Sequence, residues 1–203
     1  MKSPLPTRFV RGFVAFFALL PVLAQAHPGH DGGHGLTWDF TGGLGHPFFG
    51  LDHLLAMVAV GIWAAQLGGR ARWLVPATFV GVMTLGAALA HSGNAVVSAP
   101  AVEQLIAASL LAFGLMIALA KRLPLAVGLP FVALFAAFHG FAHGAEIPAN
   151  ASGLAYGLGF VLATVALHLA GLALGKLSLR QSARWSQLAG AGIAVVGAVL
   201  LAS

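Results

Sequence analysis

The chain has 203 residues, of which 59% are hydrophobic and 7% charged, and its net charge is +5. A soluble domain carries roughly 25% charged residues, so this composition excludes a chain folded in water and indicates a protein that crosses a membrane several times. The basic residues lie in short clusters between apolar runs, a pattern typical of membrane topology and not of a nucleic-acid surface. Because the chain has no cysteine, disulfides, Cys-ligated zinc and iron–sulfur clusters are excluded.

Residues 1–26 are expected to form a cleaved signal peptide. Positive charges precede a short apolar stretch, and Ala24-Gln25-Ala26 fits the small-x-small pattern before a cleavage site. The alternative is an uncleaved first membrane helix, against which Pro21 and the A-x-A ending argue.

Residues 27–45 are expected to form a histidine-rich N-terminal segment in the periplasm. His27, His30 and His34 stand among several glycines, which favours a flexible, weak chelator of a borderline divalent ion. The alternative is a solvated tail with no binding role.

Residues 46–203 are expected to form an all-α membrane domain, a bundle of six transmembrane helices. Six apolar runs approach the roughly 20 residues that span a bilayer. They lie at about 46–67, 73–91, 102–120, 124–143, 152–174 and 186–202.

The charged residues between these runs predict the orientation. Lys and Arg follow the first, third and fifth runs, whereas the other two connections contain neither. The positive-inside rule therefore places both ends of the mature chain on the outer side of the membrane. We expect this membrane to be the bacterial inner membrane, with both ends in the periplasm. A cleaved signal peptide predicts the same orientation. The first and fourth runs each carry His and acidic residues, which suggests an inverted repeat of three plus three helices.

The first polar cluster lies at the head of the first run. His46 and His53 are seven residues apart, so a continuous helix would align them on one face, with Asp52 about 100° away from His53. Ionisable groups inside a membrane are costly and by default functional. Asp52 is either a metal ligand or an acceptor that orients an imidazole.

The second cluster ends the fourth run. His139, His143 and Glu146 stand at i, i+4 and i+7, so they form one stripe of a helix. The predicted topology puts both clusters at matching depth in the outer part of the bilayer, where they can face each other. His91, at the outer end of the second run, is a further candidate ligand at the mouth of this region. His168, in the fifth run, is either an inner relay position or a structural residue.

Imidazoles and carboxylates without sulfur suit Ni²⁺, Co²⁺, Zn²⁺ or Cu²⁺. For each histidine the alternative is a core residue bonded to a backbone carbonyl, and for Asp52 and Glu146 it is a buried, protonated carboxyl group.

Two segments carry a resemblance to a known family. His46-Pro47-Phe48-Phe49-Gly50-Leu51-Asp52-His53 resembles the HPxxGxDH signature of the HupE/UreJ family, and residues 138–146, FHGFAHGAE, resemble its second motif, FHGxAHGxE. The resemblance implies a secondary nickel or cobalt permease associated with hydrogenase or urease maturation. It also implies six metal-handling residues: His46, Asp52, His53, His139, His143 and Glu146. The metal would then be the transported substrate, and no tightly bound cofactor is expected.

Two other classes of function compete with transport. A membrane-embedded metal-dependent enzyme, such as a zinc hydrolase, would use the pair His139 and His143 with Glu146 as base, but the glutamate is not in the HExxH position. A haem-binding electron carrier would give no reason for adjacent carboxylates. We therefore expect a transporter and not an enzyme, with a divalent ion, the lipid bilayer and a nickel-enzyme maturation system as partners.

Overall fold

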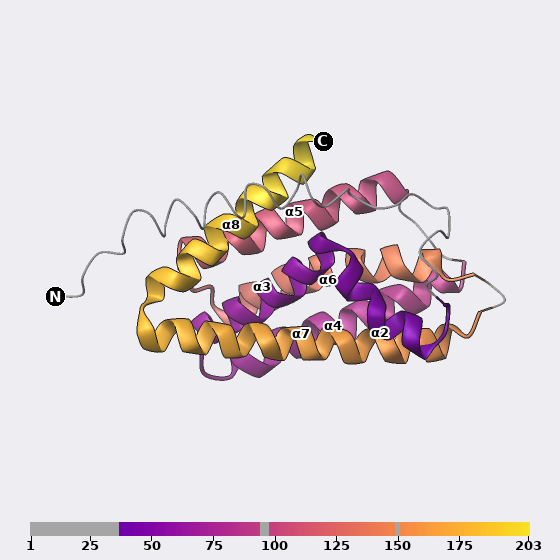
Figure 1. Cartoon of the computed structure of the whole chain (residues 1–203), viewed down its shortest axis with the longest axis horizontal. Helices are drawn as coiled ribbons and strands as arrows, with labels where there is room; N and C mark the ends of the chain where they lie inside the picture. Colours follow the sequence, from indigo (N-terminus) through magenta and orange to yellow (C-terminus); the bar gives the residue numbers. More distant parts are fainter. Residues whose placement is uncertain (1–36, 94–97, 149–150) are drawn as a thin grey trace.

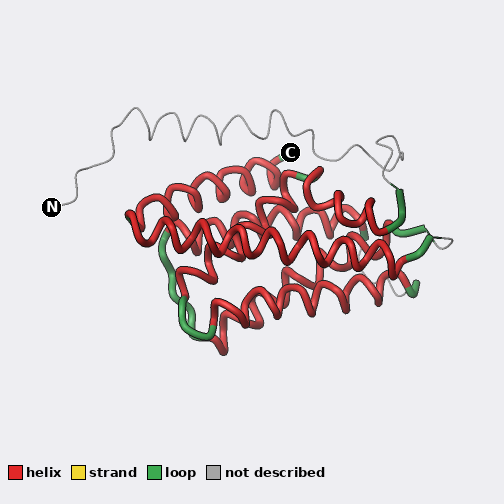
Figure 2. Tube along the Cα trace, turned by 60° about the horizontal axis from the view of Figure 1, so that its bottom comes forward, coloured by secondary structure: helices red, strands yellow, loops and turns green. Residues whose placement is uncertain are grey.

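The computed structural model describes residues 37–93, 98–148 and 151–203. Within these ranges the chain forms seven helices and no strand (Figures 1 and 2). The helices are α2 (Phe40–Phe49), α3 (Leu51–Leu67), α4 (Ala71–His91), α5 (Ala99–Ala118), α6 (Leu125–Glu146), α7 (Gly153–Gln181) and α8 (Ala183–Ala202). The expected all-helical class is therefore confirmed for the described residues. The expected signal peptide, His27, His30 and His34 lie outside them.

Five helices, α4 to α8, are each long and apolar enough to cross a membrane. The helices α2 and α3 are long and apolar enough to cross a membrane only when they are taken together as one broken span. The prediction of several membrane-spanning helices is thus confirmed, and the count reaches six only if this bent pair crosses the membrane.

The prediction that His46 and His53 align on one face of a helix in the run 46–67 is wrong. Here α2 and α3 meet at an angle of 85°. Gly50, between them, has an extended backbone with φ −92° and ψ 114°. Pro47 has no amide proton to donate within α2, which weakens the helix just before the break. His46 and His53 therefore lie on different helices, and helical periodicity does not relate them.

The first helix, α2, begins at Phe40 because Asp39 caps it. The Asp39 carboxylate accepts hydrogen bonds from the backbone N–H groups of Thr41 and Gly42, each at 2.9 Å. Hydrogen bonds from the Thr37 hydroxyl, followed by that of Thr41, hold the pKa of Asp39 well below its usual range.

The long helix α7 supports both members of the broken pair. Its 29 residues extend over about 43 Å. The backbone of α2 lies directly against its first part, where Gly43 meets Tyr156 and Gly159 meets Phe40. The backbone of α3 meets a later part, where Gly61 lies against His168. One helix thus fixes the position of α2 relative to α3 across the bend.

Glycines also bring two other pairs of helices together. Gly140 of α6 lies against the backbone of Met83 on α4, and Gly114 of α5 lies against Gly190 of α8. Small residues let membrane helices approach closely, which stabilises their packing. The main helix pairs are consequently α3 with α7, α4 with α6 and α5 with α8.

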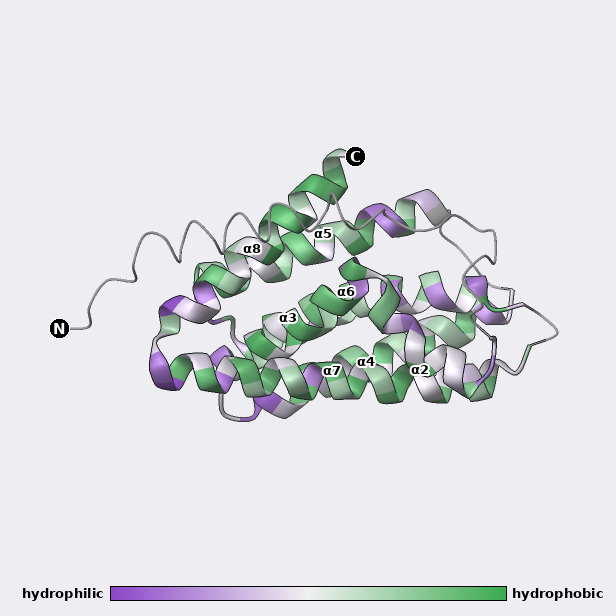
Figure 3. Ribbon diagram, viewed as in Figure 1, coloured by the Kyte–Doolittle hydropathy of each residue, from purple (hydrophilic) through white to green (hydrophobic). Residues whose placement is uncertain are grey.

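One end of the bundle collects the basic connections. The α3–α4, α5–α6 and α7–α8 connections all lie at the left of Figure 1. Trp63 donates a hydrogen bond to the Lys121 carbonyl at 3.1 Å, and Gln66 donates to the Ile117 carbonyl and the Ser186 hydroxyl at 3.1 and 3.2 Å. These bonds tie α3, α5 and α8 together at that end. Most hydrophilic residues gather towards the two ends of the bundle (Figure 3).

Candidate metal centre

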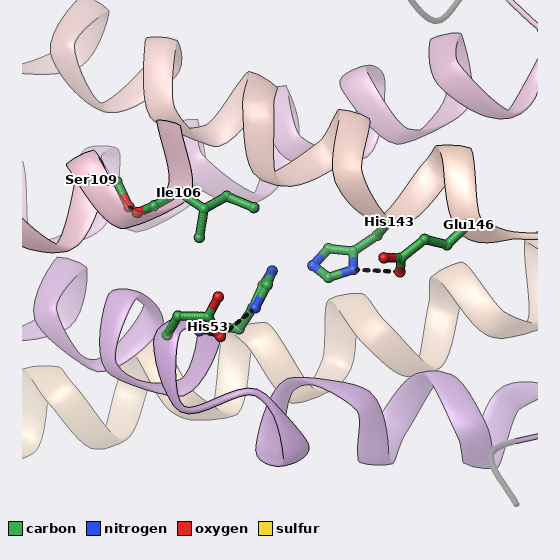
Figure 4. A network of polar contacts seen from close by, with 6 residues as sticks. His53, Ile106, Ser109, His143 and Glu146 are labelled. Carbon is green, nitrogen blue, oxygen red and sulfur yellow. Dashed lines mark hydrogen bonds and ion pairs between the residues drawn. The ribbon is translucent and has the colours of Figure 1, made fainter. Parts of the chain in front are cut away.

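Four histidine rings from three helices follow one another through the bundle. His46 of α2 lies 4.7 Å from His143 of α6, measured between ring centroids. His143 lies 4.4 Å from His53 of α3, and His53 lies 5.4 Å from His139 of α6. Figure 4 shows the rings of His53 and His143 pointing towards each other, with Glu146 beyond His143. We call this series His46–His143–His53–His139 the histidine line.

The first end of the histidine line carries a possible ligand set. His46, His143 and Glu146 each offer one nitrogen or oxygen atom, and these three atoms all lie within 4.8 Å of one another. Nδ1 of His143 is 3.7 Å from Oε2 of Glu146. Two imidazoles and one carboxylate form a donor set that borderline divalent metals use in proteins.

The accessibility of the site falls steadily from Glu146 inwards. The Glu146 side chain is 37% exposed, that of His143 is 4% exposed, and His139 is completely buried. The cluster is therefore most accessible at the Glu146 end, where an approaching cation would meet a carboxylate before the buried imidazoles.

Asp52 holds the ring of His53. Its Oδ1 accepts the His53 backbone N–H and lies 2.9 Å from Nδ1 of the same residue. A Cβ atom at Gly50 would lie 2.8 Å from this oxygen and 3.0 Å from Nδ1, so glycine leaves the room that the pair needs. Because Asp52 stands in the first turn of α3, the helix dipole also favours its negative charge. Of the two roles left open by the sequence, this geometry supports the orienting one.

The helix α6 separates its packing face from its polar face. Gly140 and Gly144 each follow a histidine and lie against the backbone of α4 at Met83 and Ala87. His139 and His143 are turned by about 100° from those glycines and contact the rings of α3 and α2 instead. The His-Gly spacing thus lets one helix pack tightly and present imidazoles at the same time.

His139 is anchored through one ring nitrogen. Its Nδ1 lies 2.9 Å from the Phe135 carbonyl, and a carbonyl only accepts, so Nδ1 carries the proton. Its Nε2 is buried and has no hydrogen-bond partner among the described residues. This nitrogen is therefore the one that can bind a metal.

Two aromatic residues of α7 border the site and were not expected from the sequence. Tyr156 lies 5.9 Å from His46 and Phe160 lies 4.3 Å from His143, between ring centroids. The Tyr156 hydroxyl is buried and has no hydrogen-bond partner in the described part of the chain. Tyr156 is the only tyrosine in the sequence, and it stands in an apolar run, which is the one signal that marks it.

His91 lies apart from the histidine line. It is exposed at the end of α4, with its Nε2 against Gly153 at the start of α7, and the group of three ligand atoms does not include it.

A bundle of apolar helices with imidazoles and a carboxylate inside it defines a multi-pass membrane protein built around a polar intramembrane cluster. Comparison with known proteins points to one family. The family described as HupE / UreJ protein matches residues 14–200. Protein HupE of Rhizobium leguminosarum bv. viciae is 43% identical over 184 residues, which is 90% of this chain and 92% of that protein. The chain belongs to the HupE/UreJ family. No solved structure matches it.

The family assignment confirms the resemblance seen in the two motifs. The HupE/UreJ family is associated with nickel and cobalt transport, so the broad function is metal transport across a membrane. Because this family is a family of transporters, membership in it does not favour the alternative of a membrane-embedded enzyme.

Proposed function

We propose that this chain is a secondary transporter that moves Ni²⁺, or Co²⁺, across the bacterial inner membrane into the cytoplasm. The histidine line is the observation that carries the proposal, because its members come from segments about 90 residues apart and still meet ring to ring. Packing alone gives no reason for four imidazoles to converge inside an apolar bundle.

The chemistry of the line suits stepwise transfer of a cation. A hydrated ion at Glu146 would exchange waters for the imidazoles of His46 and His143. Neutral nitrogen ligands favour borderline ions such as Ni²⁺ and Co²⁺ over Mg²⁺. Successive rings 4.4 to 5.4 Å apart let an ion pass between neighbouring sites without being held too tightly at any one of them.

The N-terminal segment would serve the same function from outside the bundle. After removal of residues 1–26, His27, His30 and His34 would concentrate the ion near the entrance in the periplasm, where both termini of the mature chain would lie. The sequence contains no ATP-binding P-loop, so the membrane potential, an ion gradient or trapping of the metal drives uptake. A nickel-enzyme maturation system in the cytoplasm is the partner that would trap it.

The packing of the helices supports an inverted repeat. With α2 and α3 counted as one span, an inverted repeat would relate α3 to α6, α4 to α7 and α5 to α8. The contact between α3 and α7 then corresponds to the contact between α6 and α4, and the contact between α5 and α8 corresponds to itself. Transporters built from such repeats move by rocking one half against the other around a central site. The histidine line lies between α2 and α3 of the first half and α6 of the second.

Uptake of radioactive nickel tests the proposal. Purified full-length protein in liposomes should accumulate ⁶³Ni²⁺, and excess Co²⁺ should compete better than Mg²⁺. His53→Ala and His139→Ala should each lower uptake at equal amounts of inserted protein. Protein-containing vesicles that accumulate no more nickel than empty ones would refute transport, and full uptake by both variants would refute the site.

A further inference from the structure

A fifth buried histidine lies near the inner end of the histidine line, and one aromatic ring contacts both this histidine and the last member of the line. The Phe79 ring, on α4, is 5.3 Å from the His139 ring and 5.2 Å from the His168 ring of α7. His139 and Phe79 are completely buried, and His168 is 2% exposed. The backbone of His168 lies against Gly61 of α3, eight residues after His53 towards the basic α3–α4 connection, so the series of imidazoles continues past Phe79 in that direction.

His168 is held in the same way as His139. Its Nδ1 lies 2.7 Å from the Thr164 carbonyl, four residues earlier in the helix, so that nitrogen carries the proton. Its Nε2 is buried and without a hydrogen-bond partner among the described residues, as is the Thr164 hydroxyl. A purely structural histidine would be expected to satisfy both ring nitrogens, because a buried polar atom left unpaired costs free energy. The arrangement instead leaves one ring nitrogen ready to accept a ligand.

The helix that carries Phe79 has a weak point one turn before that residue and borders a cavity. Pro76, one turn earlier, cannot donate to the Arg72 carbonyl, so α4 lacks one backbone hydrogen bond there. A cavity of about 430 Å³ lies between α4 and α7, and both Pro76 and His168 line it. Phe79 does not line this cavity, so the cavity gives room to the helix and not to the ring itself, and a shift of α4 at Pro76 would carry the Phe79 ring with it.

We propose that His168 is a second, inner binding position for the transported divalent cation, and that Phe79 is the gate between it and the histidine line. This inference rests on the proposed transport function. With Phe79 between the two rings, an apolar side chain keeps water and ions from passing, as hydrophobic constrictions do in channels. Displacement of the ring connects Nε2 of His139 with Nε2 of His168.

A variant of His168 separates the inner position from the outer site. His168→Gln keeps a hydrogen-bond donor for the Thr164 carbonyl and removes the imidazole. In liposomes, full-length H168Q should bind ⁶³Ni²⁺ at the outer site within about twofold of wild type, while uptake should fall by roughly tenfold or more. Unchanged uptake would overturn the inner position, and so would a joint loss of binding and uptake, since His168 would then support the fold. If wild type transports no nickel, the proposed function itself fails.

A pair of phenylalanine variants tests the gate and does not depend on H168Q. Phe79 and Phe113 are both completely buried, but Phe113 packs against Trp63, Phe131 and Phe135 and not against a histidine of the line. Phe79→Ala should raise the leak of ⁶³Ni²⁺ from preloaded vesicles severalfold, whereas Phe113→Ala should not. Equal leaks from the two variants would overturn the gate.

Discussion

Oδ1 of Asp52 lies 2.9 Å from Nδ1 of His53 and 2.9 Å from the His53 backbone nitrogen. Because a carboxylate accepts hydrogen bonds, Nδ1 carries the ring proton and Nε2 is the nitrogen that can bind a metal. The negative charge also makes the imidazole a better donor to that metal, as carboxylates behind metal-binding histidines do. We therefore propose that Asp52 acts on the ion through His53.

Replacement of Asp52 by Asn should weaken metal binding without abolishing it. The amide keeps the size of the side chain but loses the charge that fixes the ring, and changes behind metal ligands typically cost about 10–100-fold in affinity. Equilibrium binding of ⁶³Ni²⁺ to purified D52N would measure the change. Glu103→Gln, an exposed carboxylate on α5, is the control and should bind as wild type does. Complete loss of binding in D52N would make Asp52 a direct ligand instead.

Replacement of Gly50 by Ala should displace the His53 ring. The added Cβ would lie 2.8 Å from Oδ1 of Asp52 and 3.0 Å from Nδ1 of His53, closer than such atoms tolerate. We expect nickel uptake to fall by roughly tenfold, with normal amounts of protein in the membrane.

Gly157→Ala is the matched control for G50A, because nothing lies within 4 Å of a Cβ atom at Gly157. It should transport nickel as wild type does. If both variants keep full uptake, the bend at Gly50 tolerates a side chain and the tight fit around the Asp52–His53 pair has no consequence for transport.

The stripe on α6 could be predicted from the sequence, whereas the size and position of the bend before α3 could not. His139, His143 and Glu146 stand at helical spacing in an uninterrupted helix, so periodicity alone puts them on one face. The run that contains His46 and His53 is equally apolar, but its backbone turns by 85° at Gly50. Hydropathy does not register a turn at a single residue, since it counts apolar side chains and not backbone angles.

The residues that border the two ends of the histidine line could not be predicted from the sequence, because tertiary packing places them there. Phe79 is one of 14 phenylalanines in the sequence, and nothing local distinguishes it from Phe113. Its contact with both His139 and His168 results from how α4 packs on α6 and α7. Tyr156 reaches His46 only because α2 lies against the first part of α7.

Replacement of Gly140 by Ala should destabilise the bundle. A Cβ at Gly140 would collide with the Met83 carbonyl and the Ala87 nitrogen, which belong to the α4 backbone and cannot rotate away. Overpacking of this kind costs about 1–3 kcal/mol. Thermal unfolding in detergent should show a lower Tm than wild type. Gly81→Ala on α4, where a Cβ meets nothing within 4 Å, should not lower the Tm, since alanine favours a helix over glycine. Equal Tm values for G140A and wild type would mean that α6 can move away from α4 at little cost.

Replacement of Glu146 by Gln should mainly affect the capture of the ion. Glu146 is the most exposed of the three grouped ligands, and its Oε2 is 3.7 Å from Nδ1 of His143. Charges this exposed are screened by salt over about 8 Å at physiological ionic strength. We therefore expect E146Q to raise the apparent KM for ⁶³Ni²⁺ uptake severalfold, with a smaller change in the maximal rate, and the difference from wild type should shrink as salt rises. Glu103→Gln again serves as the control. A fall in maximal rate that is the same at low and high salt would instead assign Glu146 to the transfer step, as a ligand that the ion must bind before it reaches His143.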